Sequence, residues 1–369
     1  MRVTFTQLLG KIVFKMKSKT RSLQLLKKSR YSNLKKKLDS DLFNQDWIEV
    51  ETKKVKIKKK RAIDLFSGAG GLALGLRQAG FDIVGSVEID KDATKTMQTN
   101  FPESKHICKP IEEVEDSEIK EFKKIDLVAG GPPCVGFSVA GYRNPKDPRN
   151  LYYREYLRFI KILKPKFFLM ENVPGILTIE NGKVRDLMME EFQKLGYKTS
   201  VRILEAAEFN VPQFRTRAIF IGNRIGTKNP YPKPILDRDS YLKIEDFLKD
   251  LENHPRDTLI NHEWTNHSKD FQKRISMVAP GESLYSNFKD AYKRQYLGVP
   301  SMTIKENHGG THIHPKLNRV ISVREMARLQ TFPDNFFFEG TMKRGMWQVG
   351  NAVPVNLAKN IGLSINSFL

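Results

Sequence analysis

Short apolar runs alternate with amphipathic stretches between residues 61 and 223, and this alternation restricts the fold more than any other feature of the chain. The runs AIDLF (62–66), DIVGSVEI (82–89) and FFLMENV (167–173) have the length and content of buried strands. The stretches that follow them have helical periodicity. Strands that alternate with helices form a mostly parallel sheet covered on both faces, so the sequence predicts a doubly wound α/β fold.

Other segments extend this pattern. We expect strands at 125–131 and 217–223 and helices at 71–80, 152–163, 184–196, 322–332 and 353–365. Residues 224 to about 320 are instead rich in Pro, Asn, His and charged residues and have little periodicity. The sheet is therefore expected to be complete by residue 223, with an irregular inserted domain after it.

The charge of the chain indicates a polyanionic partner, because its formal net charge is +21 and its pI is about 9.7. Residues 1–61 hold 19 Lys and Arg against 5 Asp and Glu, so most of the excess lies before the predicted sheet. No uninterrupted apolar run reaches the roughly 18 residues that a membrane span needs. The only cysteines, Cys108 and Cys134, exclude a disulfide framework and favour a reducing, cytoplasmic location.

The first 60 residues are basic, contain several serines and have no acidic residue before Asp39. Three interpretations stay open. The segment could be a basic arm or small helical element that contacts a nucleic-acid backbone, or an acid-poor transit peptide. It could also be a solvated extension, in which case Met16 could be the true start.

A glycine-rich loop, DLFSGAGGLALG, follows the first predicted strand, and Gly68, Gly70 and Gly71 stand where the backbone must turn sharply. Glu88 lies 20 residues after Gly68, at the end of the next strand, where a carboxylate can accept hydrogen bonds from ribose hydroxyls. The pair predicts a nucleoside cofactor and fits both NAD and S-adenosylmethionine. Purely structural glycines are the alternative.

Cys134 lies in GGPPCVGFSVAG (130–141), directly after another predicted strand. Open α/β sheets bind ligands at this carboxyl edge, so the thiol is a candidate nucleophile. The alternative is an inert cysteine that packs as a small apolar residue.

Glu171 ends the next strand and is therefore expected beside the cysteine loop. A carboxyl group at the border of the apolar run FFLM loses hydration, which favours the protonated form that a general acid needs. Arg215 and Arg217 alternate at strand period in QFRTRAIFIG, so they should share a face and could anchor an anion or a ring carbonyl. The alternatives are a solvated glutamate and a solvated basic edge.

The order and spacing of these segments resemble the DNA cytosine-5 methyltransferase family, typified by bacterial restriction-modification methylases. The resemblance covers residues 61–223 and about 300–369. Its segments are DLFSGAGG (64–71), Glu88, the loop around Cys134, ENV (171–173), QFRTR (213–217), RVISVREMARLQTFPDNF (319–336) and GNAVP (350–354).

The resemblance implies chemistry that suits these residues. Carbon 5 of cytosine is a poor nucleophile, so the thiolate of Cys134 would first add to carbon 6. Glu171 would then supply a proton at N3, while Asn172 and Arg217 hold this glutamate and the cytosine O2, with Arg215 in support. The base must leave the duplex to be reached, which implies base flipping.

The implied cofactor is S-adenosylmethionine, which becomes S-adenosylhomocysteine, and no metal is implied. Its expected contacts are Phe66, Ser67, Gly68, Gly70, Gly71, Glu88, Ile89, Ile111, Pro132, Asn351 and Ala352. Two positions depart from the family pattern. Pro110 replaces an aspartate that often accepts from the adenine amino group, and Val135 replaces a frequent glutamine after the cysteine.

His308, His312 and His314 are close enough in sequence to suggest a metal site. No thiolate or carboxylate accompanies them, and the related family has a similar segment without metal. We therefore expect these histidines to contact phosphate or bases instead.

The predicted architecture is a methyltransferase (Rossmann-like) doubly wound sheet with a small inserted target-recognition domain. Its expected parts are a basic extension (1–60), the main catalytic part (61–223), the recognition domain with its hinge (224–337) and a returning segment (338–369). The expected partner is double-stranded DNA, with a restriction endonuclease acting separately, and we expect a monomer without a membrane role. Two alternatives are a transfer-RNA cytosine methylase on the same scaffold and a non-catalytic DNA-binding protein.

Overall fold

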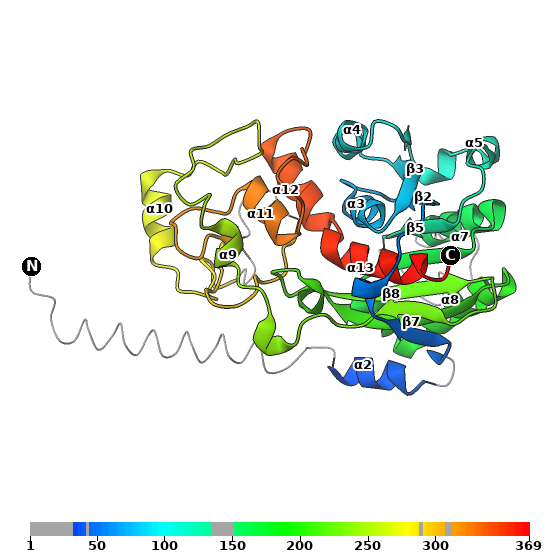
Figure 1. Ribbon diagram of the computed structural model, residues 1–369. Helices are drawn as coiled ribbons and strands as arrows, with labels where there is room; N and C mark the ends of the chain where they lie inside the picture. The colour runs from blue at the N-terminus through cyan, green and yellow to red at the C-terminus, as the bar shows by residue number, and fades with distance from the viewer. Residues whose placement is uncertain (1–31, 42–43, 134–150, 288–290, 307–311) are drawn as a thin grey trace, which may run out of the picture.

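A seven-stranded sheet forms the centre of the molecule in the computed structural model, which describes residues 32–41, 44–133, 151–287, 291–306 and 312–369 (Figure 1). The strand order is β4 (Lys105–Cys108), β3 (Phe81–Glu88), β2 (Lys60–Leu65), β5 (Leu127–Gly130), β6 (Phe167–Asn172), β8 (Thr216–Asn223) and β7 (Lys198–Glu205). Strands β4 to β6 are parallel, and β8 is antiparallel to both β6 and β7. The predicted α/β fold is confirmed.

Two apolar cores lie on the two faces of the sheet, because successive strand residues point in opposite directions. On β2, Ala62 belongs to the core shared with α3 (Gly71–Gln78), α4 (Lys91–Asn100) and α13 (Val355–Asn366). The next residue, Ile63, belongs to the other core, with α5 (Asp116–Glu121), α7 (Leu151–Leu163) and α8 (Lys183–Lys194). Helices thus cover both faces, as in a doubly wound sheet.

The described part of the basic N-terminal segment is bound to this sheet. After α2 (Ser32–Asp39), Asn44 accepts from the backbone nitrogen of Val201 and donates to its carbonyl oxygen, both at 2.7 Å. Its amide group thereby closes part of the open edge of β7. Strand β1 (Trp47–Val50) then pairs in parallel with β9 (Asn229–Pro232). The described residues of the expected extension are therefore packed on the sheet rather than forming a free arm.

The expected irregular region begins beyond β9, at residue 233. Its described elements are short: α9 (Glu245–Leu248), α10 (Lys269–Ser276), β10 (Lys293–Arg294) and β11 (His312–Ile313). Together with α11 (Val323–Leu329) they gather to one side of the large sheet (Figure 1). Long irregular connections of this kind are typical of binding loops.

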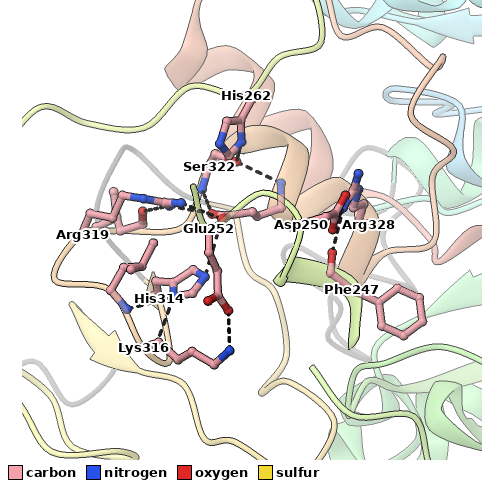
Figure 2. Close-up of polar contacts among 12 residues, drawn as sticks. Phe247, Asp250, Glu252, His262, His314, Lys316, Arg319, Ser322 and Arg328 are labelled. Atoms are coloured by element: carbon pink, nitrogen blue, oxygen red, sulfur yellow. Dashed lines mark hydrogen bonds and ion pairs between the residues drawn. The ribbon is translucent and has the colours of Figure 1, made fainter. Parts of the chain in front are cut away.

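Ion pairs and hydrogen bonds join this region to the segment that returns from it (Figure 2). The guanidinium of Arg328 on α11 contacts the carboxylate of Asp250 at 2.7 Å and the carbonyl oxygen of Phe247 at 3.1 Å. The ammonium of Lys316 contacts the carboxylate of Glu252 at 2.7 Å. The first turns of the irregular region are therefore held against residues 316–328.

A buried carboxylate organises the start of α11. Glu325 receives both ends of the Arg319 guanidinium at 2.7 Å and caps the backbone nitrogen of Ser322 at 2.7 Å. Burial opposes ionisation of Glu325, but the hydrogen bonds and charge of Arg319 hold its pKa below the ordinary value. The hydroxyl of Ser322 also contacts the ring of His262 at 2.8 Å (Figure 2). The segment 319–336, which resembles the methyltransferase family, thus contains the residues that join α11 to the irregular region.

The C-terminal part returns to the sheet through two helices. The expected helices at 322–332 and 353–365 are present as α11 and α13, whereas α12 (Met342–Asn351) was not predicted. Helix α13 packs beside α3 in the first core, which brings the end of the chain back to β2. Within the described residues, no helix is long and apolar enough to cross a membrane.

Candidate active site

A cavity of about 910 Å³ opens at the carboxyl ends of β2, β3, β5 and β6. Parallel strands place their ligand sites at this edge, and the antiparallel β8 brings its first residues to the same place. Most of the predicted site residues line the cavity: Phe66, Ser67, Gly68, Glu88, Ile89, Ile111, Pro132, Glu171, Asn172, Arg215, Arg217, Asn351 and Ala352.

The loop after β2 turns through an unusual backbone conformation. Phe66 has a φ of 55° and Gly68 a φ of 50°, both in the left-handed region. Such a conformation is costly for phenylalanine and is commonly found at ligand sites. The buried hydroxyl of Ser67 lines the cavity and has no hydrogen-bond partner within the described residues. The hydroxyl of Ser67 is therefore a candidate contact for a ligand bound in the cavity.

Gly70 and Gly71, predicted as cofactor contacts, do not line this cavity. A Cβ at Gly70 would lie 2.3 Å from the sulfur of Met97, and one at Gly71 would lie 2.4 Å from the carbonyl oxygen of Val353. Gly71 is restricted by the backbone before α13, whereas Gly70 has a φ of 85°, a left-handed conformation that favours glycine. The structure thus gives them a packing role.

The carboxylate of Glu88 is fixed at the end of β3. Its two oxygens accept from the backbone nitrogens of Gly68 at 2.7 Å and Asp90 at 2.9 Å. Burial raises the pKa of Glu88, while the Gly68 bond and the positive charge of Arg344 oppose that shift. Each oxygen keeps a free lone pair, so the group can still accept from two hydroxyls.

Pro110 and Ile111 form the wall beyond Glu88. The carbonyl oxygen of Pro110 accepts from the backbone nitrogen of Glu113 at 3.0 Å. Proline has no side-chain acceptor, so the departure from the family pattern leaves this point of the wall without the carboxylate of an aspartate. Lys109 and Glu112, which sequence reasoning did not select, line the cavity beside it.

Glu171 and Arg217 meet at the other end of the cavity. The Nε of Arg217 lies 2.5 Å from Oε1 of Glu171, and both side chains are nearly buried. A Cβ on Gly131 would lie 3.3 Å from Oε2 of Glu171, so the carboxylate is packed against the start of the cysteine loop. The predicted juxtaposition of Glu171 with that loop is thus present.

Asn172 ties the same loop to β6. Its side-chain amide donates to the carbonyl oxygen of Pro132 at 2.9 Å, and its oxygen accepts from the backbone nitrogen of Val173 at 2.9 Å. Pro132 precedes the cysteine by two positions. Cys134 and Val135 themselves lie outside the described residues.

Arg215 is fully buried behind Arg217. Its guanidinium donates to the carbonyl oxygens of Ile304 at 2.7 Å and Gly350 at 3.2 Å. It therefore connects the start of β8 to Ile304, inside the irregular region, and to the end of α12. Arg215 and Arg217 line the same cavity, as their alternation in the sequence predicted. The guanidinium of Arg215, however, donates to backbone carbonyl oxygens.

The comparisons with known proteins show the family of this chain. The family model described as C-5 cytosine-specific DNA methylase matches residues 60–367. The chain belongs to this family.

Two curated relatives and one solved structure are similar over most of their length. Type II methyltransferase M1.HphI of Haemophilus parahaemolyticus is 38% identical, covering 82% of this chain and 86% of the relative. Type II methyltransferase M.XorII of Xanthomonas oryzae pv. oryzae is 33% identical, covering 81% and 83%. A prophage-encoded protein of E. coli, described as a DNA modification methyltransferase, superposes with a TM-score of 0.67 at 29% identity, covering 83% and 98%. This methylase is thus a DNA cytosine-5 methyltransferase that uses S-adenosylmethionine.

Several residues that line the cavity of the methylase were not predicted from the sequence. Asp64 is completely buried beneath the loop, and this burial raises its pKa to about 8. Glu306 accepts from the side chain of Asn351 at 3.3 Å, and Trp347 on α12 adds an aromatic wall. The helical spacing of Trp347 and Asn351 could have indicated their common face, had α12 been recognised.

The described histidines of this cluster, His312 and His314, make hydrogen bonds within the protein. His314 accepts from the backbone nitrogens of Lys316 and Leu317 at 3.1 Å and 3.0 Å, and burial lowers its pKa to about 4. The ring of His312 contacts the amide of Gln295 at 3.1 Å. His308 lies outside the described residues. The described ranges contain no group of three or more His, Cys, Asp or Glu placed to hold a metal. His312 and His314 are both buried, so the expectation that they contact DNA is wrong for these two.

Proposed function

We propose that the methylase transfers the methyl group of S-adenosylmethionine to carbon 5 of a cytosine flipped out of a specific duplex DNA sequence, through a covalent adduct with Cys134. One observation carries this proposal. The Glu171–Arg217 pair and Asn172 lie against the start of the cysteine loop, in the same cavity as Glu88 and the loop after β2. A base and a cofactor can therefore meet in one enclosed space.

The residues of the cofactor end fit S-adenosylmethionine. Glu88 would accept from ribose hydroxyls, Phe66 and Ile89 offer apolar walls to an adenine ring, and the hydroxyl of Ser67 has no partner among the residues that the structure describes. Asn351 and Ala352 close the cavity from the end of α12. When bound, the cofactor supplies an electrophilic methyl group on a sulfonium centre.

The other end supports the covalent chemistry. The thiolate of Cys134 would add to carbon 6, and Glu171, once it has taken up a proton, would pass that proton to N3 as negative charge develops there. Arg217, fixed beside Glu171, would donate to the ring carbonyl at O2 and stabilise the same charge. Carbon 5 is then nucleophilic and takes up the methyl group. Loss of the carbon 5 proton to a base would then re-form the double bond between carbons 5 and 6 and release the thiolate, and the N3 proton would return to Glu171.

We further propose that residues 233 to about 320 form the target-recognition lobe. This stretch lies to one side of the sheet, is mostly irregular and is held in place by the ion pairs of Figure 2. The catalytic part would then be made of residues 61–223 with β9 and the returning segment 338–369, and DNA would lie between the two parts. The relatives' designation as Type II methyltransferases supports a protective role beside a separate restriction endonuclease. A monomeric state and a cytoplasmic location stay predictions.

A direct experiment compares nucleic acids as substrates. Purified methylase is incubated with radiolabelled S-adenosylmethionine and either bacterial genomic DNA or transfer RNA, and the methylated DNA is sequenced after bisulfite treatment. We expect transfer to DNA, with the protected cytosines falling in one short sequence. Transfer to RNA alone would contradict the proposal, and so would cytosines protected without any common sequence.

A further inference from the structure

Helix α12 contacts the cofactor end of the cavity through one face. Arg344, Trp347 and Asn351 are spaced by three and four residues, so their side chains lie along the same side of the helix. Trp347 and Asn351 line the cavity together with Glu88 and Ile89. Arg344 is one turn before Trp347 and points instead to the turn that follows β3.

Arg344 binds two acidic residues at the start of α4, the N-cap residue Asp90 and Asp92 in the first helical turn. Its Nε donates to Asp92 at 3.0 Å, and its Nη2 donates to Asp90. Asp90 caps α4 by accepting from the backbone nitrogen of Ala93 at 2.9 Å, and its own backbone nitrogen donates to Glu88 at 2.9 Å. The guanidinium of Arg344 is therefore linked through Asp90 to the carboxylate of Glu88, the proposed ribose contact.

The same guanidinium also packs on the indole ring of Trp347, with its central carbon 4.7 Å from the ring centroid. The chain before α12 is shaped to permit this contact. Gly340 has a φ of 93°, and a Cβ there would lie 2.9 Å from the side-chain carbon of Asp92. Arg344 thus contacts two parts of the cavity wall, the turn that holds Glu88 and the indole of Trp347.

We propose that Arg344 is a positioning residue for the cofactor, which locks the Glu88–Asp90 turn to α12 and holds Trp347 against the bound nucleoside. This inference rests on the proposed cofactor function of the cavity. It adds a contact between the returning segment and the residues that follow β3. Arg344 itself would not touch the reacting atoms. Its role is to set the width of the cofactor end.

The test measures binding of S-adenosylhomocysteine by isothermal titration calorimetry to the wild type, Arg344→Gln, Arg344→Lys and Lys343→Gln. Lys343 is an exposed neighbour on α12, so its variant loses the same charge without the bridge. We expect Arg344→Gln to raise Kd roughly tenfold, Arg344→Lys to raise it less, and Lys343→Gln to leave it unchanged. A Kd for Arg344→Gln equal to that of the wild type or of Lys343→Gln would overturn the proposal.

Tryptophan fluorescence gives a second readout that general destabilisation would not mimic. The chain has three tryptophans, and of these Trp347 lines the cavity. We expect ligand binding to change the emission of the wild type, the Trp347→Phe variant to lose that change, and Arg344→Gln to show a smaller change at saturation. Equal amplitudes in Arg344→Gln and wild type would count against the proposal.

Two outcomes keep the inference separate from the proposed function. If the wild type binds no S-adenosylhomocysteine, the cofactor assignment of the cavity is wrong. If Arg344→Gln does not fold, Trp347→Ala tests whether the indole contributes to cofactor binding while the ion pairs of Arg344 with Asp90 and Asp92 stay in place. It must then weaken binding, and an unchanged Kd would refute the role of the indole wall.

Discussion

Arg217 and Glu171 form an ion pair whose closest atoms, Nε and Oε1, are 2.5 Å apart, and they come from antiparallel neighbouring strands at one edge of the sheet. The pair is nearly enclosed, so water screens it little. In the proposed mechanism, a guanidinium held in this way would already be oriented toward the flipped base. Its geometry costs no reorganisation during the reaction.

Replacing Arg217 by glutamine should therefore lower kcat by about 100- to 1000-fold, the effect typical of losing one preorganised donor. Binding of S-adenosylhomocysteine should stay within about twofold of the wild type, because Arg217 lies at the other end of the cavity. Single-turnover methyl transfer and calorimetry measure the two quantities. Arg224→Gln, at the exposed far end of β8, is the matched control and should retain activity. Full activity in Arg217→Gln would remove this residue from the mechanism.

A second prediction concerns Pro110. Its backbone already has an extended conformation, with φ of −50° and ψ of 136°, which aspartate can adopt. Pro110→Asp should restore an acceptor for the adenine amino group and tighten S-adenosylhomocysteine binding by about 3- to 10-fold. Calorimetry with Pro102→Asp, which adds the same charge at an exposed site, provides the control. Weaker binding in Pro110→Asp would show that the adenine does not approach this wall.

His314 makes stability depend on pH. Burial lowers its pKa to about 4 from the ordinary 6.5, so the unfolded chain binds a proton that the folded chain does not in this interval. The free energy of unfolding should fall as the pH drops from 6.5 to 4, with about 3 kcal/mol of the fall due to His314. Urea denaturation at several pH values should show a shallower fall for His314→Gln, whereas the exposed His254→Gln should follow the wild type. Parallel curves for wild type and His314→Gln would contradict this assignment.

Asn44 provides a test of the N-terminal contact. Asn44→Ala would leave the backbone nitrogen and carbonyl of Val201 without the partner that they have at the edge of β7. The expected loss is about 1–3 kcal/mol in the free energy of unfolding, since buried backbone groups are costly to leave unpaired. Chemical denaturation measures it, with the exposed Asn33→Ala on α2 as control. If both variants match the wild type, the segment around residue 44 does not stabilise the sheet.

The sequence predicted the sheet well for a physical reason. Buried parallel strands are nearly continuous apolar runs, so β2, β3, β5 and β6 could be recognised without knowledge of their neighbours. It also placed Glu171 beside the cysteine loop, because consecutive parallel strands end at the same edge. The strands β1 and β9 could not be recognised, since WIEV and NPYP are short and acquire their pairing from each other.

The site was predicted less completely than the sheet. Glu88, Phe66 and Arg217 follow from motifs that are local in the sequence, whereas the role of Arg344 depends on Asp90 and Asp92, more than 250 residues earlier. Gly70 and Gly71 show the opposite case. The glycine motif suggested ligand contacts, but the space around them is taken by Met97 and Val353. The roles of such residues depend on tertiary contacts, which the periodicity of the sequence does not reveal.

Covalent capture tests the central claim most directly. The methylase is incubated with S-adenosylmethionine and duplex DNA in which 5-fluorocytosine replaces the target cytosine, and the products are separated under denaturing conditions. Fluorine cannot leave carbon 5 as a proton does, so the wild type should remain bound to the DNA through Cys134 after methyl transfer. Cys134→Ala should form no adduct while binding S-adenosylhomocysteine like the wild type. No adduct with the wild type, or an adduct that persists in Cys134→Ala, would contradict the account.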